Sequence, residues 1–111
     1  MDTIILSIKV NTPMFDIKRL TEFDEWLDSL KDTTVKRRLA TRLRKVSLGN
    51  LGDVEPVGGG VSEMREHFGK GWRMYFVQHG NTVVVMLGGG IKDTQQRDIK
   101  VAIALAKTLE F

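Results

Sequence analysis

Apolar positions in the first half of the chain repeat at the spacing of an α-helix. One stripe, which predicts a helix over residues 22–30 with Thr21 as its N-cap, consists of Phe23, Trp26, Leu27 and Leu30. A second stripe, which predicts a helix capped within residues 32–34, consists of Val35, Leu39, Leu43 and Val46. Glycine and asparagine in residues 49–52 tolerate the left-handed conformation that ends such a helix. The pattern therefore predicts a hairpin of two helices.

From residue 53 onward the pattern changes to short runs typical of β-strands, separated by glycine-containing turns. The expected strands are residues 53–57, 61–68, 72–78 and 82–87. The first of them is short and typical of a sheet edge, and the other three predict an antiparallel meander. Val83–Leu87 is apolar without alternation, which predicts a central strand covered on both sides, and Gly88–Gly90 is expected to end it.

The C-terminal segment predicts one further helix, capped by Asp93 or Thr94. Its continuous apolar face consists of Ile99, Ala102, Ile103, Ala106 and Leu109. The expected order of elements is strand, helix, helix, three strands, helix, in which the first strand falls in Met14–Arg19. Such an order predicts one α+β domain.

Residues 1–13 differ from the rest of the chain. Thr3–Val10 is rich in β-branched residues, and residues 11–13 separate it from the strand expected in Met14–Arg19. It is interpreted either as an added strand or as an extension outside a domain that spans residues 14–111. Its apolar run is too short to cross a bilayer and lacks the basic region of a signal peptide, so the sequence predicts a cytoplasmic protein without a membrane partner.

Composition narrows the class of protein only moderately. With 111 residues, 41% of them hydrophobic and 28% charged, the chain fits a single globular domain. It contains no cysteine, which excludes disulfides and thiolate metal sites. No metal-binding or nucleotide-binding motif is present, so no metal or cofactor is expected. The net charge of +3 favours polyanionic partners.

Three cations form the strongest chemical signal. Arg65 and Arg73 belong to a basic and aromatic hairpin over residues 62–76, and Lys92 follows the glycines. Side chains two apart on a strand share a face, which places Arg73 beside Tyr75. Arginine forks and a lysine converging on one phosphodiester would stabilise the charge that develops during its cleavage. The alternative is that these cations are solvated and paired with nearby carboxylates.

Cleavage of RNA without a metal also needs groups that exchange protons. The candidates for the base are Glu55, Glu63, His67 and Lys70. Each of them also fits an ordinary turn, packing or surface role.

Aromatic and basic residues extend the possible contacts with RNA. Tyr75 could stack on a splayed base or pack in the core, and the same holds for Trp72, for which the core is favoured. On the second helix, Arg38, Arg42 and Lys45 repeat on one face and could contact RNA phosphates, as could Lys70. A solvated helix face is the alternative interpretation of this basic run.

Several separated motifs, in order, resemble the RelE/ParE toxin superfamily. They are FDEWL at residues 23–27, RLR at 42–44, GNLGD at 49–53, VGGGVSEMR at 57–65, GWRMYF at 71–76 and GGGIKDTQ at 88–95. Within the superfamily the chain is most similar to the HigB-like "addiction module killer protein" group, also described as phage-derived Gp49-like. The resemblance covers residues 14–109.

The resemblance implies a RelE-like α+β fold in which two N-terminal helices pack on a small antiparallel sheet with a C-terminal helix. It also implies the toxin of a type II toxin–antitoxin system, which enters the 70S ribosome and cuts mRNA without a metal. A cognate antitoxin, often a helix-turn-helix protein, would hold it inactive. Arg65 and Arg73 match sheet positions that contact the scissile phosphate, and Lys92 matches a basic position just after the last strand. All three would stabilise the phosphate, and Tyr75 would stack on or orient a base.

The sequence departs from the family pattern at three places. Glu55 stands where members often carry lysine, and since some related toxins have a glutamate base nearby, Glu55 is a candidate base. Lys70 is the other candidate for proton exchange. Ile91 stands where an aspartate is frequent, and residues 1–13 are an addition. Two other functions stay open: a ParE-like inhibitor of DNA gyrase, and an inactive nucleic-acid-binding module of the same fold.

Overall fold

The computed structural model describes residues 14–111, so the extension or extra strand expected in residues 1–13 lies outside the described residues. Within residues 14–111 the structure contains three α-helices, a short 3-10 helix and five strands. In chain order the elements are β1 (Asp16–Arg19), α2 (Thr21–Ser29), α3 (Thr33–Ser47), β2 (Val54–Gly58), β3 (Val61–Arg65), β4 (Arg73–His79), β5 (Val83–Gly90), η1 (Lys92–Thr94) and α4 (Gln95–Ala106). This order confirms the predicted α+β fold.

The five strands form one sheet in the order β1-β5-β4-β3-β2. Strands β3 to β5 form the predicted antiparallel meander of three strands, and β2 extends it as a fourth antiparallel strand. β1 pairs with the other side of β5 in parallel. The β2–β3 pairing shifts register between Pro56 and Gly58. As expected, β2 is an edge strand and β5 is central.

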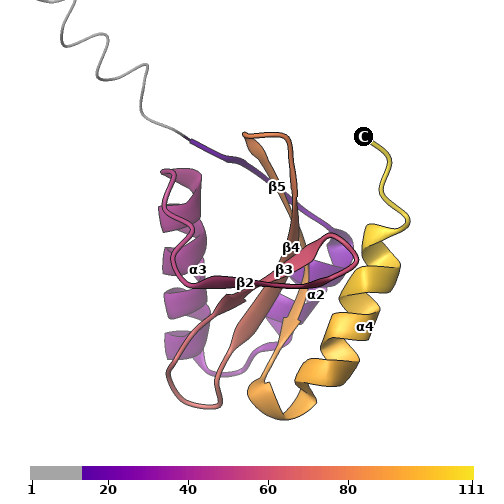
Figure 1. Ribbon diagram of the computed structural model, residues 1–111. Helices are drawn as coiled ribbons and strands as arrows, with labels where there is room; N and C mark the ends of the chain where they lie inside the picture. Colours follow the sequence, from indigo (N-terminus) through magenta and orange to yellow (C-terminus); the bar gives the residue numbers. More distant parts are fainter. Residues whose placement is uncertain (1–13) are drawn as a thin grey trace, which may run out of the picture.

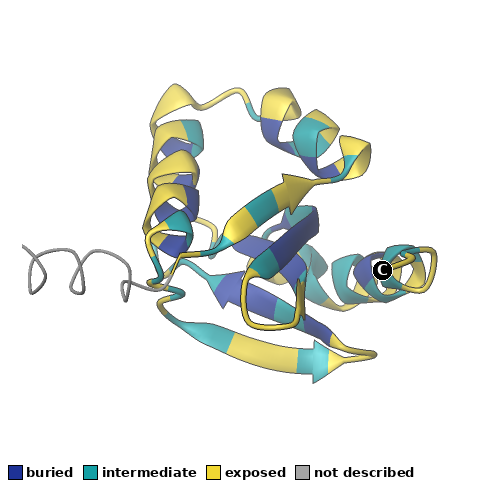
Figure 2. Ribbon diagram, turned by 90° about the horizontal axis from the view of Figure 1, so that it is seen from above, coloured by how far each residue is buried: buried dark blue, intermediate teal, exposed yellow. Residues whose placement is uncertain are grey.

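Helices cover both faces of the sheet. Figure 1 shows α3 on one side of the strands and α4 on the other, and Figure 2 shows that the helices turn their buried sides toward the sheet. The core on the side of α2 and α3 contains Phe23, Leu27, Val35, Leu39, Leu43, Val46, Met64, Met74, Phe76, Val84 and Met86. The core beneath α4 contains Val61, Tyr75, Val85, Leu87 and Ala102. Alternate residues of β5 thus enter opposite cores, which explains its unbroken apolar run.

The prediction that Gly88–Gly90 ends the last strand is wrong. β5 continues through Gly90, with Gly88 opposite Tyr75 and Gly90 opposite Arg73. Other groups pack directly against these glycines: a Cβ on Gly89 would lie 2.3 Å from the Trp26 ring, and one on Gly90 would lie 1.9 Å from Asp98 Oδ2. The glycines are therefore strand residues that admit close packing.

Helix ends agree with the predictions in part. Asp32 caps α3, because its carboxylate accepts hydrogen bonds from the backbone N–H groups of Thr34 and Val35. Thr21 is instead the first residue of α2, and the N-cap Leu20 makes no side-chain cap hydrogen bond. Thr94 precedes α4 without capping its backbone, since its hydroxyl bonds Asp98 and the carbonyl of Ile91. Within residues 14–111, no helix has the length and apolarity needed to cross a membrane.

Candidate phosphate site and basic groove

Strand register brings the predicted arginines together. Arg65 on β3 lies directly opposite Arg73 on β4, and Arg73 lies opposite Gly90 on β5. Lys92 follows Gly90 by two residues, at the same end of the sheet. Residues that pair across strands share a face, so Arg65 and Arg73 both lie on the face that α4 covers farther along the sheet. The three cations therefore gather at one end of this face.

Lys92 and Arg73 converge on the turn that precedes β4. The backbone N–H of Lys92 donates to the carbonyl of Lys70 at 3.2 Å. Gly71 has φ +73°, and a Cβ there would lie 3.1 Å from Lys92 Cβ and 3.5 Å from Arg73 Nη1. Arg73 Nη1 also donates to the Gly71 carbonyl at 3.1 Å. Gly71 thus sits between the two cations, whereas the side chains of Lys70 and Lys92 are exposed.

Arg65 forms an ion pair with a residue that the sequence patterns did not indicate. Its Nη2 lies 2.9 Å from Asp53 Oδ1 and 3.5 Å from Glu55 Oε2, and its side chain is 31% exposed. The other oxygen of Asp53, Oδ2, lies 2.6 Å from Nε2 of the exposed His67. Hydrogen bonds with Arg65 and then His67 lower the pKa of Asp53 from 3.8 to about 2, and the bond to Asp53 raises the pKa of Arg65.

Arg73 occupies a more enclosed position than Arg65. Arg73 is 7% exposed, and its Nε lies 3.9 Å from Oε1 of Glu63, which is itself 2% exposed. That distance allows an ion pair but is too long for a hydrogen bond. Gln95, at the start of α4, donates through Nε2 to both oxygens of Glu63 at 3.0 Å. The Glu63 carboxylate is thus a buried anchor between β3, β4 and α4.

The stacking role expected for Tyr75 does not fit its position. Tyr75 has no exposed surface, because it lies in the core beneath α4. Burial raises the pKa of its hydroxyl, and the charge of Glu63 raises it further. A base could reach this ring only if α4 or the sheet moved. Trp72, as favoured from the sequence, packs against the core, with its ring centroid 6.4 Å from that of Trp26.

The candidates for proton exchange lie around the arginines. Glu55 is opposite Glu63 in the β2–β3 register, and its exposed side chain faces Arg65. Lys70 is exposed in the turn between β3 and β4. Glu55 is thus in contact with Arg65, whereas Lys70 is joined through its backbone carbonyl to Lys92. The described residues contain no group of three or more His, Cys, Asp or Glu side chains arranged to hold a metal ion.

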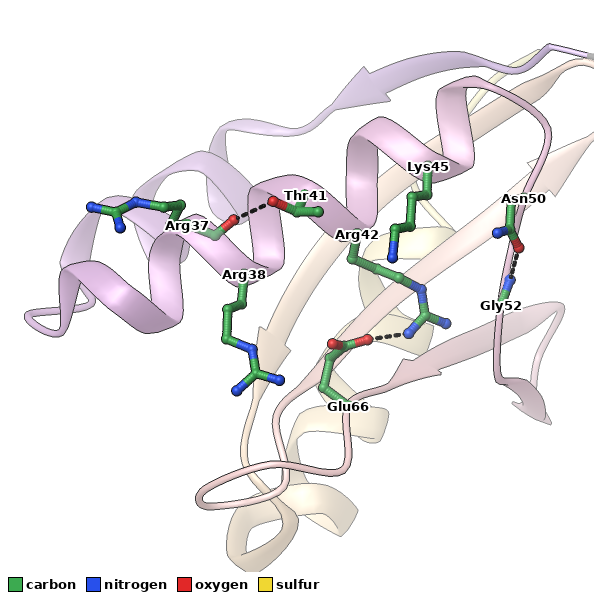
Figure 3. Close-up of a pocket in the computed structure, with 8 residues that line it drawn as sticks. All are labelled: Arg37, Arg38, Thr41, Arg42, Lys45, Asn50, Gly52 and Glu66. Atoms are coloured by element: carbon green, nitrogen blue, oxygen red, sulfur yellow. Dashed lines mark hydrogen bonds and ion pairs between the residues drawn. The ribbon is translucent and has the colours of Figure 1, made fainter.

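A groove of about 380 Å³ lies between α3 and the loops at the ends of β2 and β3. Figure 3 shows its lining residues, which are Arg37, Arg38, Thr41, Arg42, Lys45, Asn50, Gly52 and Glu66. Among these, the two predicted contacts Arg38 and Lys45 are exposed, and the Arg38 guanidinium stacks over the Phe68 ring at 3.8 Å. The single carboxylate of the lining, Glu66, is paired with Arg42. The rim of the groove is therefore cationic.

Arg42 does not fit the RNA-binding role expected from its place in the basic repeat. It is 8% exposed, and its guanidinium is paired with the carboxylate of Glu66 and with backbone carbonyls. Its donors are therefore already bonded within the protein. The i, i+4 spacing correctly predicted that Arg42 lies on the same helix face as Arg38. At Arg42, however, residues 51–53 cover this face, and carbonyls of this segment accept hydrogen bonds from the guanidinium.

Comparison with known proteins identifies the family. The model of the family described as phage derived protein Gp49-like (DUF891) matches residues 25–109. A protein of Haemophilus influenzae, described only as an uncharacterized protein, is 39% identical to this chain over 93 residues, which cover 84% of this chain and 94% of the relative. The chain therefore belongs to the phage-derived Gp49-like family, which is a RelE/HigB-like toxin family.

Proposed function

We propose that the protein is a ribosome-dependent mRNA endonuclease, the HigB-like toxin of a type II toxin–antitoxin system. The observation that carries the proposal is the cross-strand pairing of Arg65 with Arg73 beside Lys92. Fixed cations at one end of a sheet can stabilise the additional negative charge of a phosphodiester transition state. The toxin family implies an antitoxin partner. A helix-turn-helix antitoxin, the ribosome and mRNA are the partners proposed here.

The proposed reaction is attack of a ribose 2′-hydroxyl on the adjacent phosphorus. The bond from the 2′ oxygen to phosphorus forms while the bond from phosphorus to the 5′ oxygen breaks, which leaves a 2′,3′-cyclic phosphate and a 5′-hydroxyl. One group accepts the proton of the 2′-hydroxyl and another gives a proton to the leaving oxygen. Glu55, beside Arg65, and Lys70, in the adjoining turn, are proposed for these two transfers.

The two arginines take unequal parts in this proposal. Arg65 is partly exposed and would bind phosphate directly, in competition with the carboxylate of Asp53. Arg73 is mostly buried, so it would act mainly through its charge and the small exposed part of its side chain. Lys92 is exposed and would bind the same phosphate from the other side of Gly71.

The cationic groove would hold the RNA chain outside the reacting nucleotide. Arg38 and Lys45 supply its exposed charges, and Asn50 and Thr41 add uncharged hydrogen-bonding groups. Such contacts are independent of sequence and sensitive to salt. Lys70 is exposed and lies in the sequence between Glu66, which lines the groove, and Arg73. We propose that it continues these RNA contacts toward the scissile phosphate.

The burial of Arg73 and Tyr75 favours a second candidate function without cleavage. The protein would then act through binding alone, as a ParE-like inhibitor of DNA gyrase or as a nucleic-acid-binding module of the same fold without catalytic activity. Such a protein needs the shape of the sheet and helices but not an accessible phosphate site.

A direct experiment separates these functions. Purified protein is incubated with translating ribosomes and the ends of the mRNA are mapped, and a parallel assay measures supercoiling by DNA gyrase. New mRNA ends that require ribosomes and disappear in Arg65→Ala support the endonuclease. Unchanged mRNA together with inhibited supercoiling would reject it in favour of the gyrase inhibitor, and no effect in either assay would leave the binding module.

A further inference from the structure

Arg42 has an unusually complete set of hydrogen-bond partners for a residue on a basic helix face. Nε and Nη2 donate to the carbonyl of Leu51 at 3.2 and 2.8 Å, and Nη2 also donates to the carbonyl of Asp53 at 2.8 Å. Nη1 donates to the carbonyl of Arg65 at 3.0 Å and to the carboxylate of Glu66. A phosphate could bind this guanidinium only by displacing partners within the protein.

Two of these carbonyls belong to the residues whose side chains form the ion pair of the candidate site. Asp53 and Arg65 lie just beyond Val54 and Met64, the pair that opens the β2–β3 register. Between them the backbone makes one hydrogen bond, from Arg65 N to Asp53 O at 3.0 Å. Arg42 bonds the carbonyl of each, and so ties together two chain segments at the point where the ladder ends.

The loop before β2 is shaped to admit this guanidinium. Gly52 has φ +69°, and a Cβ on it would lie 3.0 Å from both Cζ and Nη2 of Arg42. Glycine is therefore favoured here both by the backbone conformation and by the closeness of the guanidinium. The charge of Arg42 is balanced by Glu66, as Figure 3 shows. Because its charge is neutralised and its side chain is enclosed, Arg42 is suited to bind the backbone of the neighbouring segments and not to attract a ligand.

We infer that Arg42 is a positioning residue that holds Asp53 and Arg65 in the geometry of the phosphate site. It acts through the two main-chain carbonyls and does not touch the substrate. Without it, the ends of β2 and β3 would keep only their single hydrogen bond, and the Asp53–Arg65 ion pair would loosen. The inference rests on the proposed function for its effect on cleavage, whereas its effect on the ion pair can be measured separately.

The test compares Arg42→Gln with Arg44→Gln in the full chain. Arg44 is exposed on the same helix, so its variant removes the same charge without touching the site. Carboxyl ¹³C NMR titration follows the pKa of Asp53, and ribosome-dependent cleavage gives kcat and KM. In a folded Arg42→Gln we expect the pKa of Asp53 to rise toward its ordinary value and kcat to fall on the order of 100-fold with little change in KM. Arg44→Gln should leave both as in the wild type.

The outcomes separate this inference from the proposed function. If the wild type cleaves no RNA but the Asp53 pKa still rises in Arg42→Gln alone, the positioning role stands and the nuclease proposal fails. A folded Arg42→Gln with an unchanged Asp53 pKa overturns the positioning role. If Arg42→Gln does not fold, Arg42→Lys is measured, and we expect an intermediate Asp53 pKa because one ammonium cannot reach all the acceptors. Loss of folding in both variants would overturn the inference, since Arg42 would then act on the whole fold.

Discussion

The side-chain amide of Gln95 donates to both carboxylate oxygens of Glu63, at 3.0 Å each. Gln95 is the first residue of α4, and Glu63 lies in the middle of β3, so this contact ties the start of the C-terminal helix to the sheet. Because Glu63 is 2% exposed, its charge depends on groups within the protein for solvation. Arg73, at 3.9 Å, supplies the opposite charge.

Replacing Gln95 should therefore lower the stability of the fold. We expect Gln95→Leu to reduce the free energy of unfolding by about 1–3 kcal/mol, since a buried carboxylate loses both amide hydrogen bonds. Urea unfolding monitored by tryptophan fluorescence measures the change. Gln96→Leu, at the exposed neighbouring position, is the control and should change stability little. Equal effects in the two variants would show that the bond to Glu63 contributes nothing specific.

The two arginines of the site should respond differently to truncation. Arg73→Ala leaves the buried Glu63 without its charge partner, and we expect a loss of about 3–5 kcal/mol. Arg65→Ala breaks ion pairs that solvent already screens, so it should cost much less stability than Arg73→Ala. Thermal unfolding of both variants compares them. A folded Arg65→Ala without cleavage activity is thus the more direct test of phosphate binding, and a stable Arg73→Ala would contradict the buried pairing.

Much of the fold can be predicted from patterns within single segments. The apolar stripes of α2 and α3 and the unbroken run of β5 each reflect local periodicity. The register that places Arg65 opposite Arg73 does not follow from such a pattern: β3 ends at Arg65, whereas the strand was expected to continue to residue 68. The sequence did not indicate Asp53 or Gln95, because their partners lie 12 and 32 residues away and depend on strand register and on how α4 docks. Local propensity carries no information on either.

The burial of individual side chains was the property that sequence patterns predicted least well. Arg42 shares its spacing with the exposed Arg38 and Lys45, and only the path of residues 51–53 encloses it. Tyr75 and Arg73 alternate correctly onto one face, yet α4 covers the first and Glu63 holds the second. Alternation gives the face of a strand, whereas the depth at each point depends on what packs above it.

The Asp53 carboxylate predicts a definite dependence of stability on pH. The pKa of Asp53 is lowered from its ordinary value of 3.8 to about 2 in the folded protein. The ionised carboxylate therefore stabilises the fold fully above pH 3.8, and this stabilisation is lost as the pH falls toward 2. The difference in unfolding free energy between wild type and Asp53→Asn should therefore shrink over this range. Urea unfolding at a series of pH values measures it. Asp28→Asn, exposed on α2, is the control, and a difference independent of pH would contradict the pairing of Asp53.

Gly71 should be sensitive both to strain and to crowding. An alanine there must adopt φ near +73° and would bring Cβ within 3.1 Å of Lys92 Cβ. Gly80 has φ +62° but no atom within 4 Å of a Cβ, so Gly80→Ala measures the strain alone, about 1–2 kcal/mol. We expect Gly71→Ala to lose more stability than Gly80→Ala and also to reduce cleavage, because Lys92 and Arg73 would shift. Equal losses would mean that the site absorbs the added methyl group.

The groove on α3 should reveal its role in the salt dependence of RNA binding. If Arg38 and Lys45 each neutralise a phosphate, the double variant to alanine should bind single-stranded RNA more weakly at low salt. The slope of log affinity against log salt should also decrease by about 0.7 for each contact removed. Fluorescence anisotropy at several salt concentrations measures both quantities.

The control for the groove is a matched double variant on the other side of the sheet, in which two exposed cations of α4, Arg97 and Lys100, are replaced by alanine. If both double variants lower the slope equally, RNA responds to net charge alone, and the groove is not a specific binding surface.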